Sequence, residues 1–177
     1  MATSSTRDRI LDALERLLLD HSAQQATLEA VAAEAGVSKG GLLYHFPTKE
    51  AMLAAMVRRM GARSDDQFAE AVAGGTDVAE FYLQTFDEAD FEDRPLYQSV
   101  LAALRSADGS HGEVHTAVVE VMRSWDHWLQ AEFDDPVQAE IVRLVGDGIF
   151  MAALLDLPAP DPALHRQVVD RLLGRDG

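Results

Sequence analysis

The segment TLEAVAAEAGVSKGGLLYHF, at residues 27–46, decides the fold of this chain. Thr27 stands where a helix N-cap is expected, and the run LEAVAAEA after it has helical apolar spacing and ends at Gly36. Ser38 then predicts the start of a second short helix, which continues to about Phe46, where the following proline stops it. The segment therefore predicts two short helices joined by a tight turn.

The spacing inside this segment is that of a helix-turn-helix. Small Ala32 lets the two helices approach closely, and Gly36 can adopt the positive φ that the turn needs. Val31, Val37 and Leu42 fall where the motif needs core residues. Such a unit places its second helix in the major groove of DNA, with that helix's N-terminal residues nearest the bases.

Candidate DNA-binding residues follow from this placement. Those expected to face the groove are Lys39, Gly40, Gly41, Tyr44 and His45, with Thr27 and Lys49 beside them at helix N-termini. A helix N-terminus carries unpaired N–H groups and a partial positive charge, so it binds phosphate. A glycine inside a helix costs about 1 kcal/mol, and close approach of the backbone to a duplex is one reason for the glycine pair. Taken alone, the glycines also fit a loop, and the aromatic residues also fit a half-buried helix end.

The segment VSKGGLLYHFPTKEAML, at residues 37–53, closely resembles the signature of tetracycline-repressor (TetR) type transcriptional regulators. In that family the recognition helix ends in Tyr-His-Phe or Tyr-His-Tyr and leads into Pro/Ser/Thr-Lys-Glu. The resemblance covers residues 7–60. The contacts that it implies are with phosphates for Thr27, Tyr44, His45 and Lys49, and along the groove for Ser38, Lys39 and Gly40. Family members often carry Ser or Thr at the position of Gly41, which leaves open the bases that this chain reads.

Charge is distributed unevenly along the chain. The formal net charge of −15 argues by itself against a nucleic-acid partner, because phosphate binding depends on Lys and Arg. However, residues 1–63 carry eight basic and seven acidic side chains, whereas residues 64–177 carry seven basic and twenty-three acidic ones. The acidic excess therefore lies outside the expected DNA-binding region, where it suits a solvated surface.

The rest of the chain is expected to be helical. Apolar residues recur at helical spacing and β-branched alternation is nearly absent, so the predicted class is all-α with about nine helices. Breaks are expected at 73–77, 93–95, 106–112, 133–136 and 156–162. We expect a three-helix helix-turn-helix DNA-binding domain at 1–50, joined to a larger helical domain for effector binding and dimerisation at 51–177.

The expected location is the cytoplasm. The chain has no cysteine, which excludes disulfides and thiolate metal sites and fits a reducing compartment. Acidic residues interrupt the apolar stretch near the N-terminus, so no signal peptide is predicted. The longest apolar stretch, 137–157, contains Glu140, Arg143 and Asp147, which a bilayer core would penalise.

A homodimer is expected because one short recognition helix discriminates poorly between sequences, whereas two copies read two half-sites of a near-palindromic operator. The segments 137–155 and 163–173 are the candidates, since the first is apolar on several faces. TetR-type proteins are similar in pairing their last two long helices as a four-helix bundle. The candidate interface residues are Val142, Val145, Ile149, Leu164 and Val168. The alternative is a central core helix in a monomer.

A small-molecule effector site is expected in the second domain. The candidates are Phe86, Tyr97, Met122, Trp125, Trp128, Asp147, Phe150 and Met151, although each also fits core packing. The indole N–H groups of Trp125 and Trp128 need partners, and a buried carboxylate at Asp147 is costly unless it is paired. Ring faces together with carboxylates suit a hydrophobic, cationic effector. Residues 143–157 are also similar to the same stretch in drug-efflux regulators of the family.

Two other functions stay open. His111 and His115 in HGEVH could share a metal, but the order differs from the zincin His-Glu-x-x-His, and we predict no metal, cofactor or catalytic residue. No nucleophile elbow, phosphate-binding loop or dinucleotide fingerprint is present, so an enzyme is not expected. The other alternative is a DNA-binding regulator without a small-molecule effector, controlled by a protein partner through its acidic face.

Overall fold

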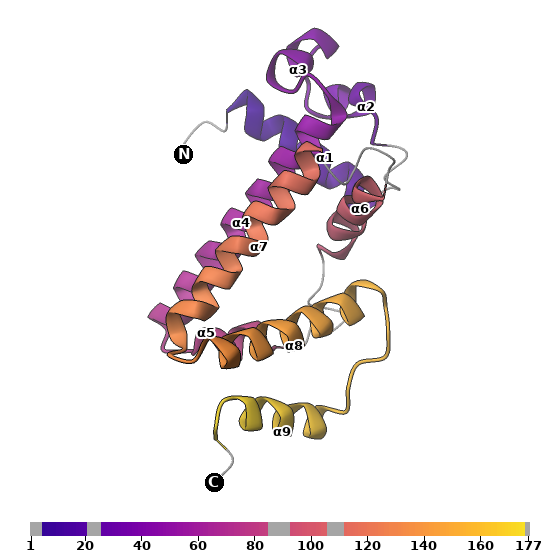
Figure 1. The fold of residues 1–177 in the computed structure, drawn as a ribbon. Coiled ribbons are helices and arrows are strands. Elements are labelled where there is room, and N and C mark those ends of the chain that lie inside the picture. The colour runs from indigo at the N-terminus through magenta and orange to yellow at the C-terminus, as the bar shows by residue number, and fades with distance from the viewer. Residues whose placement is uncertain (1–4, 21–25, 85–92, 106–111, 176–177) are drawn as a thin grey trace. The chain divides into compact units, whose positions relative to one another are not determined.

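The computed structural model describes residues 5–20, 26–84, 93–105 and 112–175, which form nine helices (Figure 1). The helices are α1 (Thr6–Asp20), α2 (Leu28–Glu34), α3 (Lys39–His45), α4 (Lys49–Ala73), α5 (Val78–Tyr82), α6 (Arg94–Leu104), α7 (Glu113–Glu132), α8 (Pro136–Leu154) and α9 (Pro162–Leu172). The all-α class is confirmed. The breaks expected at 73–77, 133–136 and 156–162 separate α4 from α5, α7 from α8, and α8 from α9.

Packing divides the chain into two compact units. The first consists of residues 1–60 and 93–121, and the second of residues 61–92 and 122–177. The long helices α4 and α7 therefore contribute residues to both. The functional boundary predicted at residue 50 stays a prediction, because a packing unit and a DNA-binding domain need not end at the same residue.

The core of the first unit forms around the amphipathic helix α1. Ile10, Leu11 and Leu14 are almost fully buried, and they belong to one apolar cluster with Leu42 of α3 and Met52 of α4. Burying each such side chain contributes about 1.5–3 kcal/mol. The short helices α2 and α3 thus obtain their stability from this shared core, since helices of one or two turns are marginal alone.

Arg59 adds an ion-pair network between α4 and α1. Its guanidinium lies 2.6 Å from Asp12 Oδ1 and 2.7 Å from Glu15 Oε1, and its side chain is only 18 % exposed. Partial burial strengthens such pairs relative to exposed ones. The network therefore fixes the orientation of the first half of α4 relative to α1.

The second unit has its own apolar core. Phe68 of α4, Leu83 next to α5, Leu129 of α7 and Val142 of α8 are buried in one cluster. Aromatic side chains surround this cluster. The second unit therefore has an apolar core of its own, bordered by aromatic side chains. Across the described residues, every helix falls short of the length and apolarity that a membrane span requires.

Candidate functional sites

The turn of the helix-turn-helix is closed by backbone hydrogen bonds. Gly36 has a φ of +65°, in the left-handed region that favours glycine. The N–H of Val37 donates to the carbonyl of Ala32, and the N–H of Gly36 donates to that of Ala33. This is the Schellman pattern that ends a helix at a left-handed residue. The predicted positive φ at Gly36 is confirmed.

Three hydroxyl side chains cap the helices of the motif. Thr27 Oγ1 accepts from the N–H of Ala30, Ser38 Oγ from that of Gly41, and Thr48 Oγ1 from that of Ala51, at 3.1, 3.0 and 2.9 Å. The caps predicted at Thr27 and Ser38 are therefore confirmed. A hydroxyl that accepts such a bond still has its own hydrogen to donate.

Helix α3 has a buried face and an exposed face. Leu42 is fully buried and the adjoining Phe46 is 2 % exposed, whereas Ser38, Lys39 and Gly40 are exposed. Tyr44 is 86 % exposed, the highest value among the exposed large apolar side chains described. Gly41 and His45 are half-buried, and the His45 ring lies edge-on to Tyr44 with their centroids 5.2 Å apart. The structure thus brings the predicted groove-facing residues together on one short helix.

The candidate DNA-binding surface also includes two lysines, Lys39 and Lys49, and two N-cap residues, Thr27 and Ser38. Lys39 Nζ lies 2.6 Å from Glu29 Oε1 of α2, and both side chains are mostly exposed. The ammonium of Lys49, at the start of α4, is half-buried, and its burial lowers the pKa of Lys49 from its ordinary value. The surface therefore offers cationic and hydroxyl donors in the first unit.

The predicted effector residues are divided between the units. Trp125, Trp128, Asp147 and Phe150 lie in the second unit, and Tyr97 packs against the core of the first. Met122 is half-buried, Met151 is 42 % exposed, and Phe86 lies outside the described residues. The second unit alone therefore brings four of the candidates near one core.

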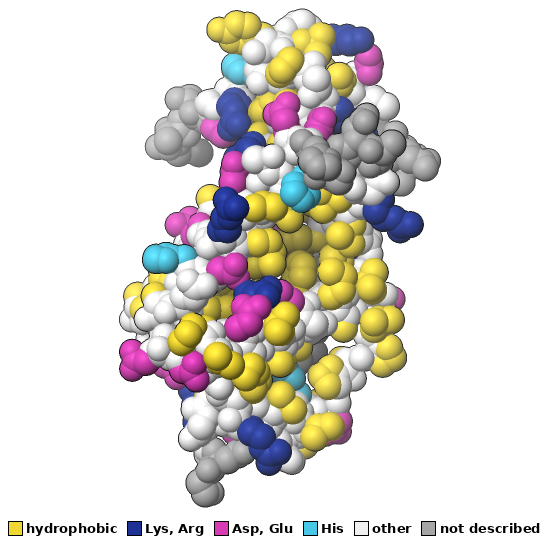
Figure 2. Space-filling model, viewed as in Figure 1, with side chains coloured by type: hydrophobic (Ala, Val, Ile, Leu, Met, Phe, Trp, Pro, Cys, Tyr) yellow, Lys and Arg dark blue, Asp and Glu magenta, His cyan; other side chains and the backbone are white. Residues whose placement is uncertain are grey.

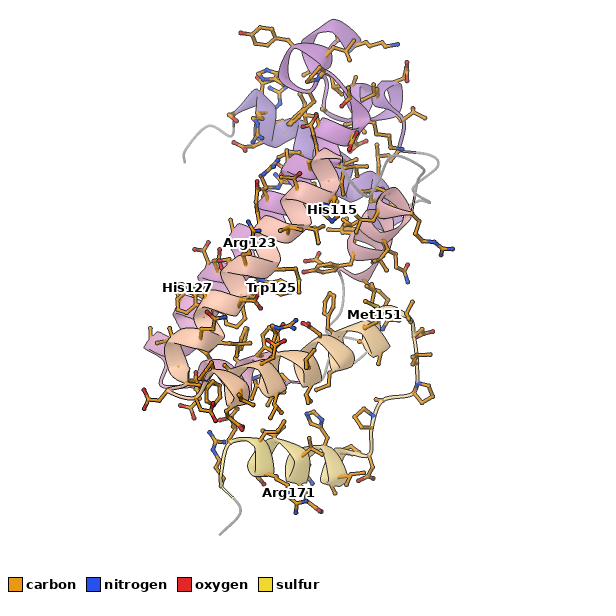
Figure 3. The ribbon with its side chains drawn as sticks, in the orientation of Figure 1. His115, Arg123, Trp125, His127, Met151 and Arg171 are labelled. Carbon is orange, nitrogen blue, oxygen red and sulfur yellow. The ribbon has the colours of Figure 1, made fainter. Side chains whose placement is uncertain are left out.

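An aromatic cluster lines this core. Phe68 stacks on Trp128 with the ring centroids 6.0 Å apart, and Trp125 lies edge-on to Tyr82 at 6.4 Å and to Phe150 at 6.3 Å. Trp125 projects from the side of α7 that faces α8, opposite to His127 (Figure 3). The rings come from four helices, so the cluster depends on tertiary packing that local sequence does not reveal.

An ion cluster centred on Arg143 of α8 lies beside these rings. The guanidinium is 2.6 Å from Glu140 Oε1, 2.6 Å from Asp147 Oδ2 and 3.6 Å from Asp126 Oδ1 of α7. The Tyr82 hydroxyl donates to Asp147 Oδ1 at 2.6 Å. Asp147 therefore has both a cation and a hydroxyl as partners. Of this cluster, the predicted effector residues include only Asp147.

Two buried polar atoms near the cluster make no hydrogen bond to any residue that the structure describes. Within the described residues, neither Trp125 Nε1 nor Asp126 Oδ1 has a hydrogen-bond partner, although both atoms are buried. Trp128 differs, because its Nε1 donates to Asp65 Oδ1 at 3.1 Å. Burial raises the pKa of Asp126, the nearby Arg143 guanidinium opposes this, and Asp147 adds to it. Burial and the bond to Asp147 also raise the pKa of Tyr82.

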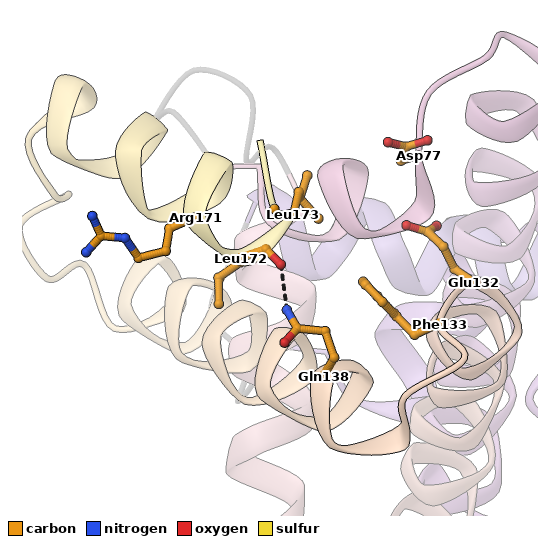
Figure 4. Close-up of a pocket in the computed structure, with 8 residues that line it drawn as sticks. Asp77, Glu132, Phe133, Gln138, Arg171, Leu172 and Leu173 are labelled. Atoms are coloured by element: carbon orange, nitrogen blue, oxygen red, sulfur yellow. Dashed lines mark hydrogen bonds between the residues drawn. The ribbon is translucent and has the colours of Figure 1, made fainter. Parts of the chain in front are cut away.

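A separate open groove of about 530 Å³ lies beside the N-terminal end of α8 (Figure 4). Its lining combines the carboxylates of Asp77 and Glu132 with apolar side chains such as Phe133. These carboxylates already have partners, since Asp77 pairs with Arg175 and Glu132 accepts from the N–H of Ala79. None of the predicted effector residues lines this groove.

Helix α8 also carries an exposed apolar stripe, which we define as Val137, Ile141, Leu144, Gly148, Met151 and Leu155, the last directly after the helix. The intervals of four and three residues place them along one side, and apolar side chains gather over this part of the surface in Figure 2. Leu164 and Val168 of α9 are also exposed, at 57 % and 39 %. In contrast, Val142, Val145 and Ile149 pack in or against the core of their own chain. The α8 residues that the sequence suggested for the dimer interface thus lie on the side of the helix that faces the core of its own unit.

The histidine pair of the metal alternative is only partly described. His115 lies on α7, and His111 lies outside the described residues. Among the residues that are described, no three His, Cys, Asp or Glu side chains are grouped so that they could hold a metal ion.

Comparison with known proteins agrees with this architecture. Residues 10–56 match the family of bacterial regulatory proteins of the tetR type, and residues 76–175 match the tetracyclin repressor-like C-terminal domain. A comparison with curated proteins returned no match.

Solved structures resemble the whole chain. The multidrug binding protein EbrR complexed with ethidium has a TM-score of 0.69 and 28 % identity, over 95 % of this chain and 98 % of that one. EbrR complexed with malachite green has a TM-score of 0.65 and 28 % identity, over 94 % and 96 %. A TetR family member from Streptomyces coelicolor A3 has a TM-score of 0.66 and 28 % identity, over 95 % and 98 %. With its helix-turn-helix and both of its domains matched, this chain belongs to the TetR family of transcriptional regulators.

Proposed function

We propose that this regulator is a repressor that binds a near-palindromic operator as a homodimer and is released by a hydrophobic, cationic effector. The observation that carries the DNA-binding part is the exposed side of α3, where Ser38, Lys39, Gly40 and Tyr44 face solvent while Leu42 is buried. The proposed location is the cytoplasm, where the operator is accessible.

The proposed DNA contacts use the exposed donors of the first unit. Lys39, Gly40, Gly41 and the hydroxyl of Ser38 lie along the groove, and Thr27, Tyr44, His45 and Lys49 contact phosphates. Gly40 supports this arrangement, because a Cβ there would meet nothing closer than Ser38 Oγ at 4.0 Å. The chain itself therefore gives no steric reason for glycine at this helical position. A closely approaching DNA backbone supplies one.

The proposed dimer interface is the exposed apolar stripe of α8 together with Leu164 and Val168 of α9. A contiguous apolar surface of this kind marks an interaction site more often than a solvated face. Two copies would place two α3 helices on half-sites about 34–36 Å apart, one turn of B-DNA.

The proposed effector is an aromatic cation. One relative at 28 % identity, the multidrug binding protein EbrR, has been solved in complex with ethidium and with malachite green. In this chain the aromatic cluster lies beside three carboxylates and one guanidinium. Aromatic faces and negative charge together attract a lipophilic cation.

Selection of bound duplexes from a random DNA library at low salt tests the proposal. The expected outcome is an inverted repeat whose retention falls when malachite green, an aromatic cation that is too twisted to intercalate like ethidium, is added. Tyr44→Phe should weaken retention without changing the unfolding temperature, because this side chain is 86 % exposed. Enrichment of no sequence would refute the operator part, and retention unaffected by aromatic cations would refute the effector part, favouring control by a protein partner.

A further inference from the structure

We propose that Arg143 is an internal counter-cation, which holds the carboxylates of the effector site in the ligand-free protein and must give them up, or share them, when a cationic effector binds. This inference rests on the proposed effector class. It adds that Arg143 determines how strongly the site prefers a cationic ligand to an uncharged one.

The first support is the set of contacts. Arg143 donates to both oxygens of Glu140 and to Asp147 Oδ2, and it lies within ion-pair distance of Asp126. Three carboxylates therefore share one guanidinium, which leaves two formal negative charges when all are ionised. The cluster has a charge surplus that a second cation can reduce.

The second support is the unequal pairing of the three carboxylates. Glu140 and Asp147 lie within four residues of Arg143 on the same helix and make short contacts of 2.6 Å, whereas Asp126 comes from α7 at 3.6 Å. The Asp126 Oδ1 atom has no hydrogen-bond partner among the described residues, and neither has the neighbouring Trp125 Nε1. The unmet polar groups therefore lie on two adjacent residues of α7, Trp125 of the aromatic cluster and Asp126 of the ion cluster.

The third support is the available space. The cavity lined by Asp126, Glu140 and Arg143 has a volume of only about 20 Å³. This is enough for about one water molecule and far too small for a tricyclic dye. Because the Arg143 side chain forms part of the wall, its displacement would enlarge the cavity and remove the cation that faces Asp126 and Glu140 there.

The test measures dye affinity in Arg143→Gln. Ethidium should bind this variant about tenfold more tightly than the wild type, because a like charge within several ångströms of the dye is removed. Uncharged phenanthridine should bind both proteins equally within about twofold. Arg123→Gln is the matched control, since Arg123 is an exposed arginine of α7 in the same unit, and it should leave both affinities unchanged.

The outcomes separate this inference from the proposed function. Equal ethidium affinity in wild type and Arg143→Gln, or weaker binding in the variant, would overturn the role of Arg143 while leaving the effector class intact. Failure of ethidium and malachite green to bind either protein would overturn the effector class and the inference with it.

A second measurement avoids dependence on the variant's folding. The Nε–H signal of Arg143 in the NMR spectrum of the wild type should shift and lose its exchange protection when ethidium is added. Arg143→Lys retains the charge without the forked geometry and should bind ethidium as weakly as the wild type. An Arg143 signal that ethidium does not perturb would contradict the proposal.

Discussion

At the scale of single residues, the ion pair between Lys39 and Glu29 connects the recognition helix to the helix before it. Both side chains are more than half exposed, so solvent screens the pair and it adds little to stability. In the proposed complex Lys39 lies along the groove of the DNA and has to leave Glu29 to do so. The Glu29 carboxylate therefore competes with the DNA for the Lys39 ammonium.

Glu29→Gln should strengthen operator binding about two- to fivefold, since Lys39 no longer has to be released. It should also steepen the dependence of log K on log salt by up to about 0.9, the value for one additional DNA charge neutralised by the protein. Fluorescence anisotropy over a series of salt concentrations measures both quantities. Glu34→Gln is the control, because it removes the same charge from α2 while leaving Lys39 paired. Equal effects of the two variants would mean that only overall charge matters.

Asp126 makes the stability of the protein depend on pH. Its ordinary pKa is 3.8, and burial raises it in the folded state, helped by Asp147 and Glu140 and opposed by Arg143. At a pH between the pKa of Asp126 in the unfolded chain and its higher pKa in the folded chain, Asp126 is more protonated in the folded chain. The stability due to this group therefore falls as the pH rises through that interval and is constant above it.

Asp126→Asn should raise the unfolding temperature relative to wild type at neutral pH, because the substitution removes a poorly solvated charge. The advantage should shrink as the pH is lowered towards about 4, where the folded wild type is increasingly protonated. Calorimetry from about pH 4 to pH 8 measures the difference. Asp134→Asn, at an exposed position, controls for the change in net charge. A difference between wild type and Asp126→Asn that is independent of pH would contradict the explanation.

At the scale of elements, the sequence predicted the helix-turn-helix closely because its determinants are local. Thr27, Gly36 and Ser38 act on backbone groups two to four residues away, so their types and spacing were sufficient. The pairs of Arg143 with Glu140 and Asp147 are local and follow from their spacing on one helix, whereas its contact with Asp126 joins two helices and residues seventeen positions apart. Tyr82 reaches Asp147 over a separation of 65 residues. Contacts of this kind depend on the packing of whole helices.

The face of α8 shows another limit of sequence reasoning. The helix is apolar on several sides, so periodicity alone cannot tell which side faces the core of its own chain. Val142 is fully buried, whereas Ile141, one residue earlier, is 40 % exposed. A shift of one residue turns the helix by about 100° and changes which side chains reach solvent.

Two glycines of α8 should respond oppositely to alanine. A Cβ at Gly146 would lie 2.3 Å from two ring carbons of Tyr82, whereas a Cβ at Gly148 would meet nothing within 4 Å. Gly146→Ala should lower the free energy of unfolding by about 1–2 kcal/mol, because overpacking exceeds the gain in helix propensity. Gly148→Ala should raise it by up to about 1 kcal/mol. Chemical denaturation at equal protein concentration measures both variants.

The double variant Tyr82→Ala/Gly146→Ala checks the cause. With the ring removed, the alanine at position 146 should no longer be destabilising relative to Tyr82→Ala alone. If its cost persisted, the backbone of α8 would be the source of the strain.

At the scale of the whole molecule, operator binding by this regulator should depend on the exposed apolar stripe of α8. Leu144, which is 57 % exposed in the single chain, lies within it. Leu144→Glu places a charge in the proposed interface without changing the core of the chain. The protein should then sediment as a helical monomer and bind the operator at least about tenfold more weakly, because only one half-site is engaged at a time.

Val72→Glu is the control for this prediction. Val72 is a similarly exposed apolar residue, at 46 %, in the second unit but outside the stripe. It should leave the sedimentation of the protein unchanged. A Leu144→Glu protein that still sedimented as a dimer would show that another surface joins the two copies.

Arg143 and Leu144 are neighbours in the sequence, but Arg143 belongs to the ion cluster and Leu144 to the exposed apolar stripe. Under the proposed function, substitutions along α8 will therefore be pleiotropic, and variants selected for a new inducer will tend to alter subunit affinity as well. Directed evolution of this regulator as a biosensor should succeed sooner through the rings contributed by α5 and α7, where drug preference can change while assembly is left alone.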